Sequence, residues 1–174
     1  MVSFIDCHLS LRRCSPFNGG KFEGWGTSFL LVAKSNLAIW MSCQSRLQSC
    51  FFDPKEGLGL NIIRYNIGGG DDPTHHHITR TDSMVPGYAI NPSHDANGYH
   101  WSYDWNADQN QRNVLMKVAE CYGKDLIVEG FSNSPPYFMT NSGCSSGSVN
   151  AGENNLCEDA YGAFASYLAD VAQH

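Results

Sequence analysis

The sequence predicts an α/β fold built on a parallel β-sheet. Two apolar segments each run into a loop rich in glycine, proline and polar residues: GLGLNIIRYNIGGGDD at 57–72, and DLIVEGFSNSPPYFMTNSG at 125–143. Two stretches of helical periodicity follow, one after each segment. Apolar strands that alternate with helices are typical of parallel sheets, where polar side chains gather at the carboxyl ends of the strands.

The first strand is expected within KFEGWGTSF at 21–29, and the second is LGLNIIRYNI at 58–67. A long stretch at 68–108 follows, rich in Gly, Pro, Asn, Asp and His, which we interpret as a loop. It carries several aromatic residues, and disordered segments contain few of these. Because long loops are usually either functional or disordered, we expect this loop to be functional.

A helix is expected from Asp108, with Asp108 and Gln111 as a capping box and Gly123 as its end. Its apolar face is formed by Leu115, Val118, Ala119 and Tyr122. The next strand is predicted at 125–131.

A last helix is expected to be capped by Asn155 and Glu158, and it runs nearly to the end of the chain. Its buried face is predicted to contain Tyr161, Phe164, Leu168 and Val171.

Size and charge narrow the function classes. The chain has 174 residues, enough for one domain with a core. A complete eight-stranded β/α barrel needs about 250 residues, so barrel strands in this chain would form only part of one. The net charge of −6 argues against nucleic acid or an anionic membrane as a partner. We find no apolar run of membrane-spanning length and no signal-peptide pattern, and the compartment stays open.

The seven cysteines show no metal-like spacing. A disulfide between Cys144 and Cys157 and a pair of free thiols are equally compatible with the sequence. His75, His76 and His77 form the only histidine cluster, but adjacent loop residues rarely all face one metal ion. We therefore expect neither a metal site nor another cofactor.

Four segments resemble glycoside hydrolase family 30, and most closely its endo-β-1,6-galactanase-like branch. They are FEGWGTS, GLGLNIIRYNIGGGDDPTHHHITRTDSMVPGY, SYDWNADQNQR and FSNSPPYFMTNSGCSSG, in this order. The resemblance covers residues 21–33 and 51–174. It implies a (β/α)8 barrel with a small β-sandwich beside it. Residues 1–20 would then be an irregular remnant of the sandwich, and 21–174 the first three strand–helix units of the barrel.

The resemblance also implies a retaining glycosidase with two glutamates, an acid/base in an Asn-Glu-Pro motif after the fourth strand and a nucleophile after the seventh. A retaining pair lies about 5–5.5 Å apart. No Asn-Glu-Pro occurs in this sequence, which ends where the family enters its fourth strand. We therefore expect no catalytic residue here and no activity from this chain alone. Glu129 is not expected to act as an acid or base with Asp71 or Asp104.

Residues 30–50 fit the family poorly. One hypothesis is a shifted reading frame, since removing single bases from A or T runs restores a family-like amphipathic helix. Trp40, Cys43 and Cys50 would then be artefacts. The alternative is a divergent helix, and resequencing the gene would decide between them.

We predict eight substrate-binding residues, each with a structural alternative. By resemblance, Arg64 lies beneath a sugar subsite and orders the nucleophile, although it would equally suit an ion pair with an acid. Asn66 lies at the same strand exit. Asp71 and Asp72 follow three glycines that allow close backbone approach, and they suit either sugar hydroxyls or a turn.

The other four residues lie in the two loops. Asp104 and Trp105 are expected at a subsite, because aromatic faces stack on sugars, or else in an aromatic cluster that anchors the loop. Asn133 and Tyr137 are expected to reach the −1 sugar, unless Tyr137 is a packed loop residue. Trp25 is expected to pack at the barrel end rather than to bind sugar.

The expected partner is a β-linked oligo- or polysaccharide. The leading hypothesis is part of a retaining endo-glycosidase acting on β-1,6-galactan. Other specificities of the family, toward glucosylceramide, β-1,6-glucan or xylan, come next. A non-catalytic carbohydrate-binding remnant is the alternative of a different class.

Overall fold

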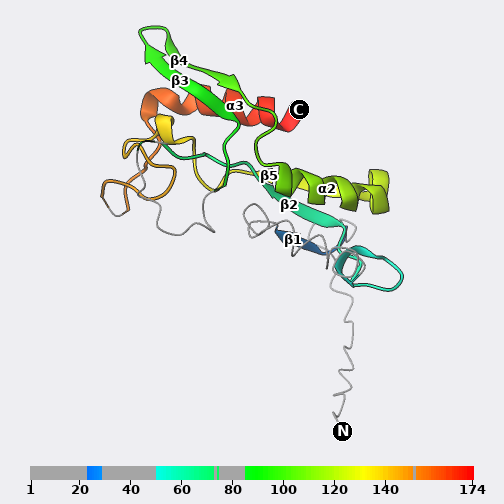
Figure 1. The fold of residues 1–174 in the computed structure, drawn as a ribbon. Coiled ribbons are helices and arrows are strands. Elements are labelled where there is room, and N and C mark those ends of the chain that lie inside the picture. Colours follow the sequence, from blue (N-terminus) through cyan, green and yellow to red (C-terminus); the bar gives the residue numbers. More distant parts are fainter. Residues whose placement is uncertain (1–22, 29–49, 73, 75–84, 151) are drawn as a thin grey trace.

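Among the residues that it describes, the computed structural model contains a small parallel sheet, an antiparallel hairpin and the helices α2 and α3 (Figure 1). It describes residues 23–28, 50–72, 74, 85–150 and 152–174. The expectations for residues 1–20, for the shifted frame within 30–49 and for the histidine cluster at 75–77 lie outside the described residues.

The sheet has three parallel strands in the order β1-β2-β5. They are β1 (Gly26–Ser28), β2 (Ile62–Asn66) and β5 (Ile127–Phe131). Arg64 in the central strand lies opposite Ser28 on one side and Glu129 on the other. The α/β class and the three predicted strands are confirmed, although each strand is shorter than expected.

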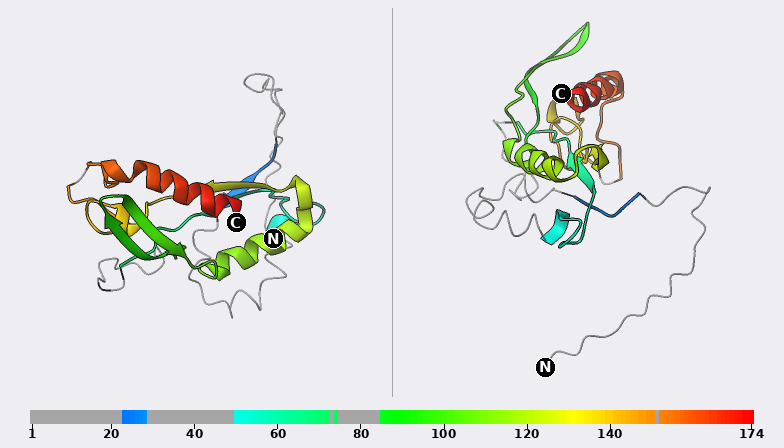
Figure 2. Two further views of the ribbon diagram at one scale, coloured as in Figure 1. Left: turned by 90° about the horizontal axis from the view of Figure 1, so that it is seen from above. Right: turned by 90° about the vertical axis from the view of Figure 1, so that its right-hand side faces the viewer.

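The two faces of β2 have different surroundings. Ile63 is fully buried against Phe52, Val114 and Val118, and Tyr65 packs in a second apolar cluster with residues from helix α3. Helices α2 (Gln109–Tyr122) and α3 (Tyr161–Gln173) lie on this side of the sheet (Figures 1 and 2). The side chains of β2 therefore alternate between the apolar core and the opposite face of the sheet, which carries Arg64.

The prediction of a long loop at 68–108 is wrong in its second half. Residues Ala89–Asp95 (β3) and Gly98–Tyr103 (β4) form an antiparallel hairpin with a bulge. Two signals favoured it: the Asn97-Gly98 pair, which is common in hairpin turns, and an aromatic at every second position of β4. Pro92 obscured β3, because proline is rare inside strands.

Helix α2 spans the expected residues and ends at Gly123, but the predicted capping box is wrong. Asp108 has φ 55°, and its side chain caps no backbone N–H. Its carboxylate instead accepts a hydrogen bond from the Gln111 side chain at 2.5 Å. Both side chains are buried and point toward β2, where they form the network described below.

Helix α3 begins at Tyr161, after the short 3₁₀ turn η5 (Glu158–Ala160). Asn155 is no helix cap, because its side chain bonds the N–H of Ser142 and the carbonyl of Cys144. Three residues of the predicted face, Phe164, Leu168 and Val171, pack against the buried cluster as expected. Tyr161 is instead 50% exposed, and the fully buried Tyr167 on the same face was not predicted.

Candidate functional site

The carboxyl ends of β2 and β5 meet at a polar cavity of about 230 Å³. Both neighbouring loops contribute, since Asn66 ends β2 and Asn133 follows β5. The remaining lining residues are Ile67, Gly68, Gly69, Val85, Ser134, Ser145 and Ser146. Parallel strands place their carboxyl ends on the same edge of the sheet, and this geometry brings the two predicted asparagines together.

Asn66 is fixed from two directions. Its backbone N–H donates to Gln111 Oε1 at 2.9 Å, and its carbonyl accepts from Gln111 Nε2 at 3.0 Å. Its side-chain Oδ1 accepts the backbone N–H of Asn133 at 3.4 Å. The hydrogen bonds therefore link helix α2, the end of β2 and the loop after β5.

The three glycines before Asp71 lie between two neighbouring loops. A Cβ on Gly68 or Gly69 would overlap a backbone carbonyl, that of Pro86 or that of Pro135. Gly69 also accepts the N–H of Tyr137 at 3.2 Å, and the buried Tyr167 hydroxyl donates to the Gly68 carbonyl at 2.8 Å. In this structure the close approach that glycine permits is to other backbone.

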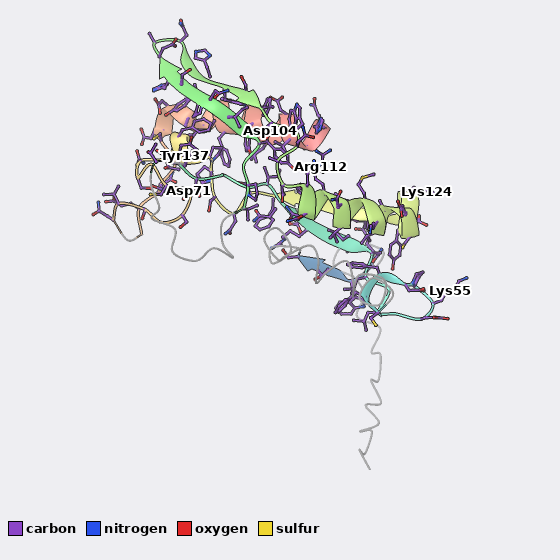
Figure 3. The ribbon with its side chains drawn as sticks, viewed as in Figure 1. Lys55, Asp71, Asp104, Arg112, Lys124 and Tyr137 are labelled. Atoms are coloured by element: carbon purple, nitrogen blue, oxygen red, sulfur yellow. The ribbon has the colours of Figure 1, made fainter. Side chains whose placement is uncertain are left out.

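Asp71, Asp72 and Tyr137 form a second polar group beside the glycines. Partial burial raises the pKa of Tyr137, and the nearby charges of Asp72 and Asp71 raise it further. Asp72 also forms a turn, because its Oδ1 accepts the N–H and hydroxyl of Thr74 at 2.8 and 2.7 Å. Figure 3 shows Asp71 and Tyr137 at the same end of the molecule. Tyr137 therefore stays a neutral donor at ordinary pH, next to two acceptors.

Arg64 and Glu129 form an ion pair on the polar face of the sheet. Arg64 Nε and Nη2 lie 3.1 and 3.4 Å from the two oxygens of Glu129, and both side chains are about half exposed. The guanidinium also lies over the Phe131 ring, 4.7 Å from its centroid. An open cavity of about 290 Å³ borders the pair. Arg64 thus holds a carboxylate, in the side-by-side geometry that its fork favours.

Asp104 and Trp105 lie in the segment between β4 and α2, and neither lines the cavity at Asn66. Asp104 Oδ1 accepts the N–H of Asn106 at 2.9 Å, as in a turn. The Trp105 ring stacks on Tyr103 and on His174, with centroids 4.3 and 4.1 Å apart. The structure thus places Trp105 in an aromatic cluster, and its subsite role stays a prediction.

A buried polar network supports the site from the helix side. Tyr65 donates to Asp108 Oδ2 at 3.1 Å, and its hydroxyl lies 2.5 Å from that of Tyr88. Burial raises the pKa of Asp108 to about 6, against the lowering effects of Gln111, Tyr65 and Arg112. Burial likewise raises the pKa of Tyr65 and Tyr88. The carboxyl of Asp108 therefore titrates in the mildly acidic range.

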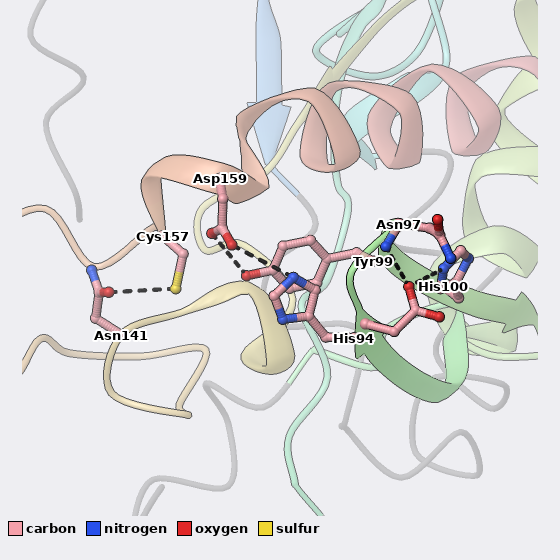
Figure 4. A network of polar contacts seen from close by, with 8 residues as sticks. His94, Asn97, Tyr99, His100, Asn141, Cys157 and Asp159 are labelled. Atoms are coloured by element: carbon pink, nitrogen blue, oxygen red, sulfur yellow. Dashed lines mark hydrogen bonds and ion pairs between the residues drawn. The ribbon is translucent and has the colours of Figure 1, made fainter.

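The hairpin is fastened to η5 by a surface network (Figure 4). The Tyr99 hydroxyl donates to Asp159 at 3.1 Å, and His94 lies 3.5 Å from the same carboxylate while stacking on Tyr99 at 4.1 Å. Cys157 donates to Asn141 at 3.4 Å. The contacts to Asp159 hold the hairpin against η5, and the Cys157 contact ties the residue before η5 to the loop that follows β5.

Cys144 and Cys157 are free thiols in the structure. The described residues contain no group of three or more His, Cys, Asp or Glu side chains that could bind a metal ion. Within the same residues, no helix has the length and apolar character needed to cross a bilayer.

Comparison with known families assigns the chain to a protein family. The model of O-glycosyl hydrolase family 30 matches residues 20–174, most of its length. The chain belongs to O-glycosyl hydrolase family 30.

The relatives that the chain matches are longer proteins. This family 30 chain is 36% identical over 176 residues to an endo-β-1,6-galactanase of Hypocrea rufa, covering 90% of the chain and 34% of that protein. It is 29% identical to an exo-β-1,6-galactobiohydrolase of Bifidobacterium longum subsp. longum, covering 92% of the chain and 14% of the relative. The chain therefore spans about a third or less of these relatives.

A solved structure agrees in fold. The catalytic domain of GH30 xylanase C from Talaromyces cellulolyticus superposes with a TM-score of 0.53 at 19% identity, covering 86% of the family 30 chain and 32% of that domain.

Sequence reasoning did not identify the buried polar residues that support the site from the helix side. Gln111 precedes Val114, Val118 and Tyr122 at helical spacing, so its place on the buried face was visible in the sequence. A buried glutamine needs partners, and this requirement was the signal for a polar network. The serines of the cavity, Ser134, Ser145 and Ser146, gave no such signal.

Proposed function

We propose that this chain forms the first part of the (β/α)8 barrel of a retaining glycoside hydrolase that acts on β-1,6-linked galactan. The observation that carries the proposal is the polar cavity at the exits of β2 and β5, in a chain whose family and relatives are glycosidases. Three parallel strands with both helices on one side are the arrangement expected of a barrel segment.

Within this proposal, the two polar groups at the strand exits bind a neutral sugar. The side-chain amides of Asn66 and Asn133 and the serine hydroxyls supply donors and acceptors for sugar hydroxyls. Tyr137 supplies a protonated phenol, and Asp71 and Asp72 supply acceptors. Such a mixture suits an uncharged polyol better than an anion, because the carboxylates would repel a negative ligand.

Arg64 is proposed to lie beneath the sugar, where its pair with Glu129 holds the guanidinium in place. Asp104 and Trp105 stay predicted subsite residues at a separate place, on the segment between the hairpin and α2. Their variants therefore report on a different part of the substrate than variants of Asn133 do.

The chain alone is proposed to bind sugar without cleaving it. Retaining hydrolysis needs two carboxylates about 5–5.5 Å apart, and the family acid/base motif Asn-Glu-Pro does not occur in the sequence. The residues described here therefore act as one wall of a cleft, which orients the substrate for acids supplied by other parts of a longer protein.

The experiment is a titration of the 174-residue chain with β-1,6-linked galactotriose, followed by amide NMR. We expect saturable shifts centred on Asn66, Asn133 and Tyr137, weakened by Asn133→Ala, and no release of galactose. β-1,4-linked xylotriose serves as the comparison ligand. If β-1,4-linked xylotriose bound equally well, galactan would no longer be the proposed substrate. If neither sugar bound, the proposal would be contradicted.

A further inference from the structure

We propose that Gln111 is a positioning residue for the sugar-binding wall: its amide clamps the backbone of Asn66 and thereby sets the place of Asn133. This inference rests on the proposed function for its biological meaning, whereas the clamp itself is measurable without sugar.

The first step is the burial of Gln111. Its side chain is fully buried in the first turn of α2, beneath the end of β2. An amide in such a place is costly unless it is bonded, and Gln111 bonds both the N–H and the carbonyl of Asn66. A neighbouring parallel strand would make the same pair of bonds to one residue. Gln111 therefore satisfies both backbone hydrogen-bonding groups of Asn66.

The second step is the link from Asn66 to the cavity. Asn66 is only 2% exposed, so its side chain has little freedom. Its Oδ1 accepts the N–H of Asn133, the residue that follows β5 by two positions and lines the cavity. A change in the Asn66 backbone therefore displaces Asn133 as well.

The third step is the orientation of the amide. Gln111 Nε2 faces two acceptors, the Asn66 carbonyl at 3.0 Å and Asp108 Oδ2 at 2.5 Å, whereas Oε1 faces a single N–H. A reversed amide would place Oε1 against the Asn66 carbonyl and Asp108 Oδ2, and Nε2 against the Asn66 N–H, so only one orientation satisfies the neighbours. Asp108 thus selects the orientation that clamps Asn66.

Charged and titratable groups surround this carboxylate from several elements. Tyr65 of β2 donates to it, Arg112 of α2 stabilises its charge, and the hydroxyl of Tyr88 lies one hydrogen bond farther. From α3, Tyr167 lies close enough for the charge of Asp108 to raise its pKa. The N–H and carbonyl of Asn66 both bond Gln111 and none of these side chains, within the part of the chain that the structure describes.

The test compares two variants with matched controls. Gln111→Glu keeps the acceptor for the Asn66 N–H but loses the donor to its carbonyl, and Gln111→Met loses both. Gln109→Glu and Gln109→Met make the same changes at an exposed position of the same helical turn. We expect both Gln111 variants to shift the NMR signals of Asn66 and Asn133 and the Gln109 variants to leave them in place.

A second readout is affinity for β-1,6-linked galactotriose, which should fall by about tenfold or more in Gln111→Met, since misplaced contacts lose much of their binding energy. Unchanged Asn133 signals in both Gln111 variants would overturn the clamp. If wild-type chain binds no sugar but the signals shift, the proposed function fails and the clamp stands.

If a Gln111 variant fails to fold, the clamp can still be tested on the wild-type chain. The Asn66 amide should exchange with solvent as slowly as the core of β2, and a hydrogen-bond scalar coupling should join Gln111 Nε2 to the Asn66 carbonyl. Fast exchange of this amide, or the absence of the coupling, would equally refute the proposal.

Discussion

Asp108 should make the stability of this protein depend on pH between about 4 and 6. Its side chain is 5% exposed, and burial raises its pKa from 3.8 to about 6. Within this window the folded state still holds a proton that the unfolded chain has lost, so the free energy of unfolding falls as the pH rises. One pKa unit corresponds to about 1.4 kcal/mol, and the loss is therefore about 3 kcal/mol.

The substitution that isolates this effect is Asp108→Asn. Asparagine tolerates the left-handed backbone at φ 55° and keeps an oxygen that accepts from Gln111 and Tyr65. It carries no titrating proton. The difference in unfolding free energy, wild type minus variant, should fall by about 3 kcal/mol from pH 4 to pH 7.

Urea unfolding at several pH values, followed by circular dichroism, measures this difference. Asp53 and Asp95 also contribute to the pH dependence of unfolding, because backbone hydrogen bonds lower their pKa values. Their contributions cancel in the difference, since both proteins contain them. Asp125→Asn, at an exposed position just after α2, controls for the change in net charge. A difference between wild type and Asp108→Asn that stays constant over this range would refute the reasoning.

Four substitutions probe the packing and the exposed ion pair of the sheet and its helices. Gly69→Ala adds a methyl that overlaps a backbone carbonyl, so urea unfolding should show a loss of about 1–3 kcal/mol. Gly130→Ala, with its nearest atom 3.7 Å from the new methyl, should change stability little, and equal losses would contradict the packing argument. Gly162→Ala in α3 meets nothing within 4 Å and should raise the free energy of unfolding by up to about 1 kcal/mol, measured by calorimetry. Glu129→Gln should cost less than about 1 kcal/mol, because its pair with Arg64 is half exposed; a larger loss in the same unfolding assay would show that the pair is structural.

The sequence was most informative where apolar residues follow one another without interruption. Strands β2 and β5 were predictable because apolar runs bounded by glycine and proline have few alternative structures in a chain of this size. Their exits, Asn66 and Asn133, followed from the parallel arrangement alone. The hairpin was less visible because Pro92 and a bulge break the alternation of β3, although β4 retains a clear period of two.

The start of helix α2 was predicted at the right place for the wrong reason. Asp108 and Gln111 have the spacing of a capping box, and the same spacing also brings two side chains to one face of a helix. Which of these occurs depends on what lies beneath the helix. Here the N–H and carbonyl of Asn66, at the end of β2, lie there and bond Gln111, and local sequence contains no record of that contact.

The three glycines at 68–70 show that one local sequence signal is compatible with two structural roles. Glycines before a polar loop indicate that the backbone turns tightly or approaches another group closely, and the sequence was compatible with a sugar site or a turn. In the structure the approached groups are the carbonyls of Pro86 and Pro135, so the glycines let three loops pack into one edge. Tyr167, from a helix about 100 residues farther along the chain, secures the same edge by its bond to Gly68. The glycines therefore set the place of the loop that carries Pro135 and Tyr137, and substitutions there should lower stability.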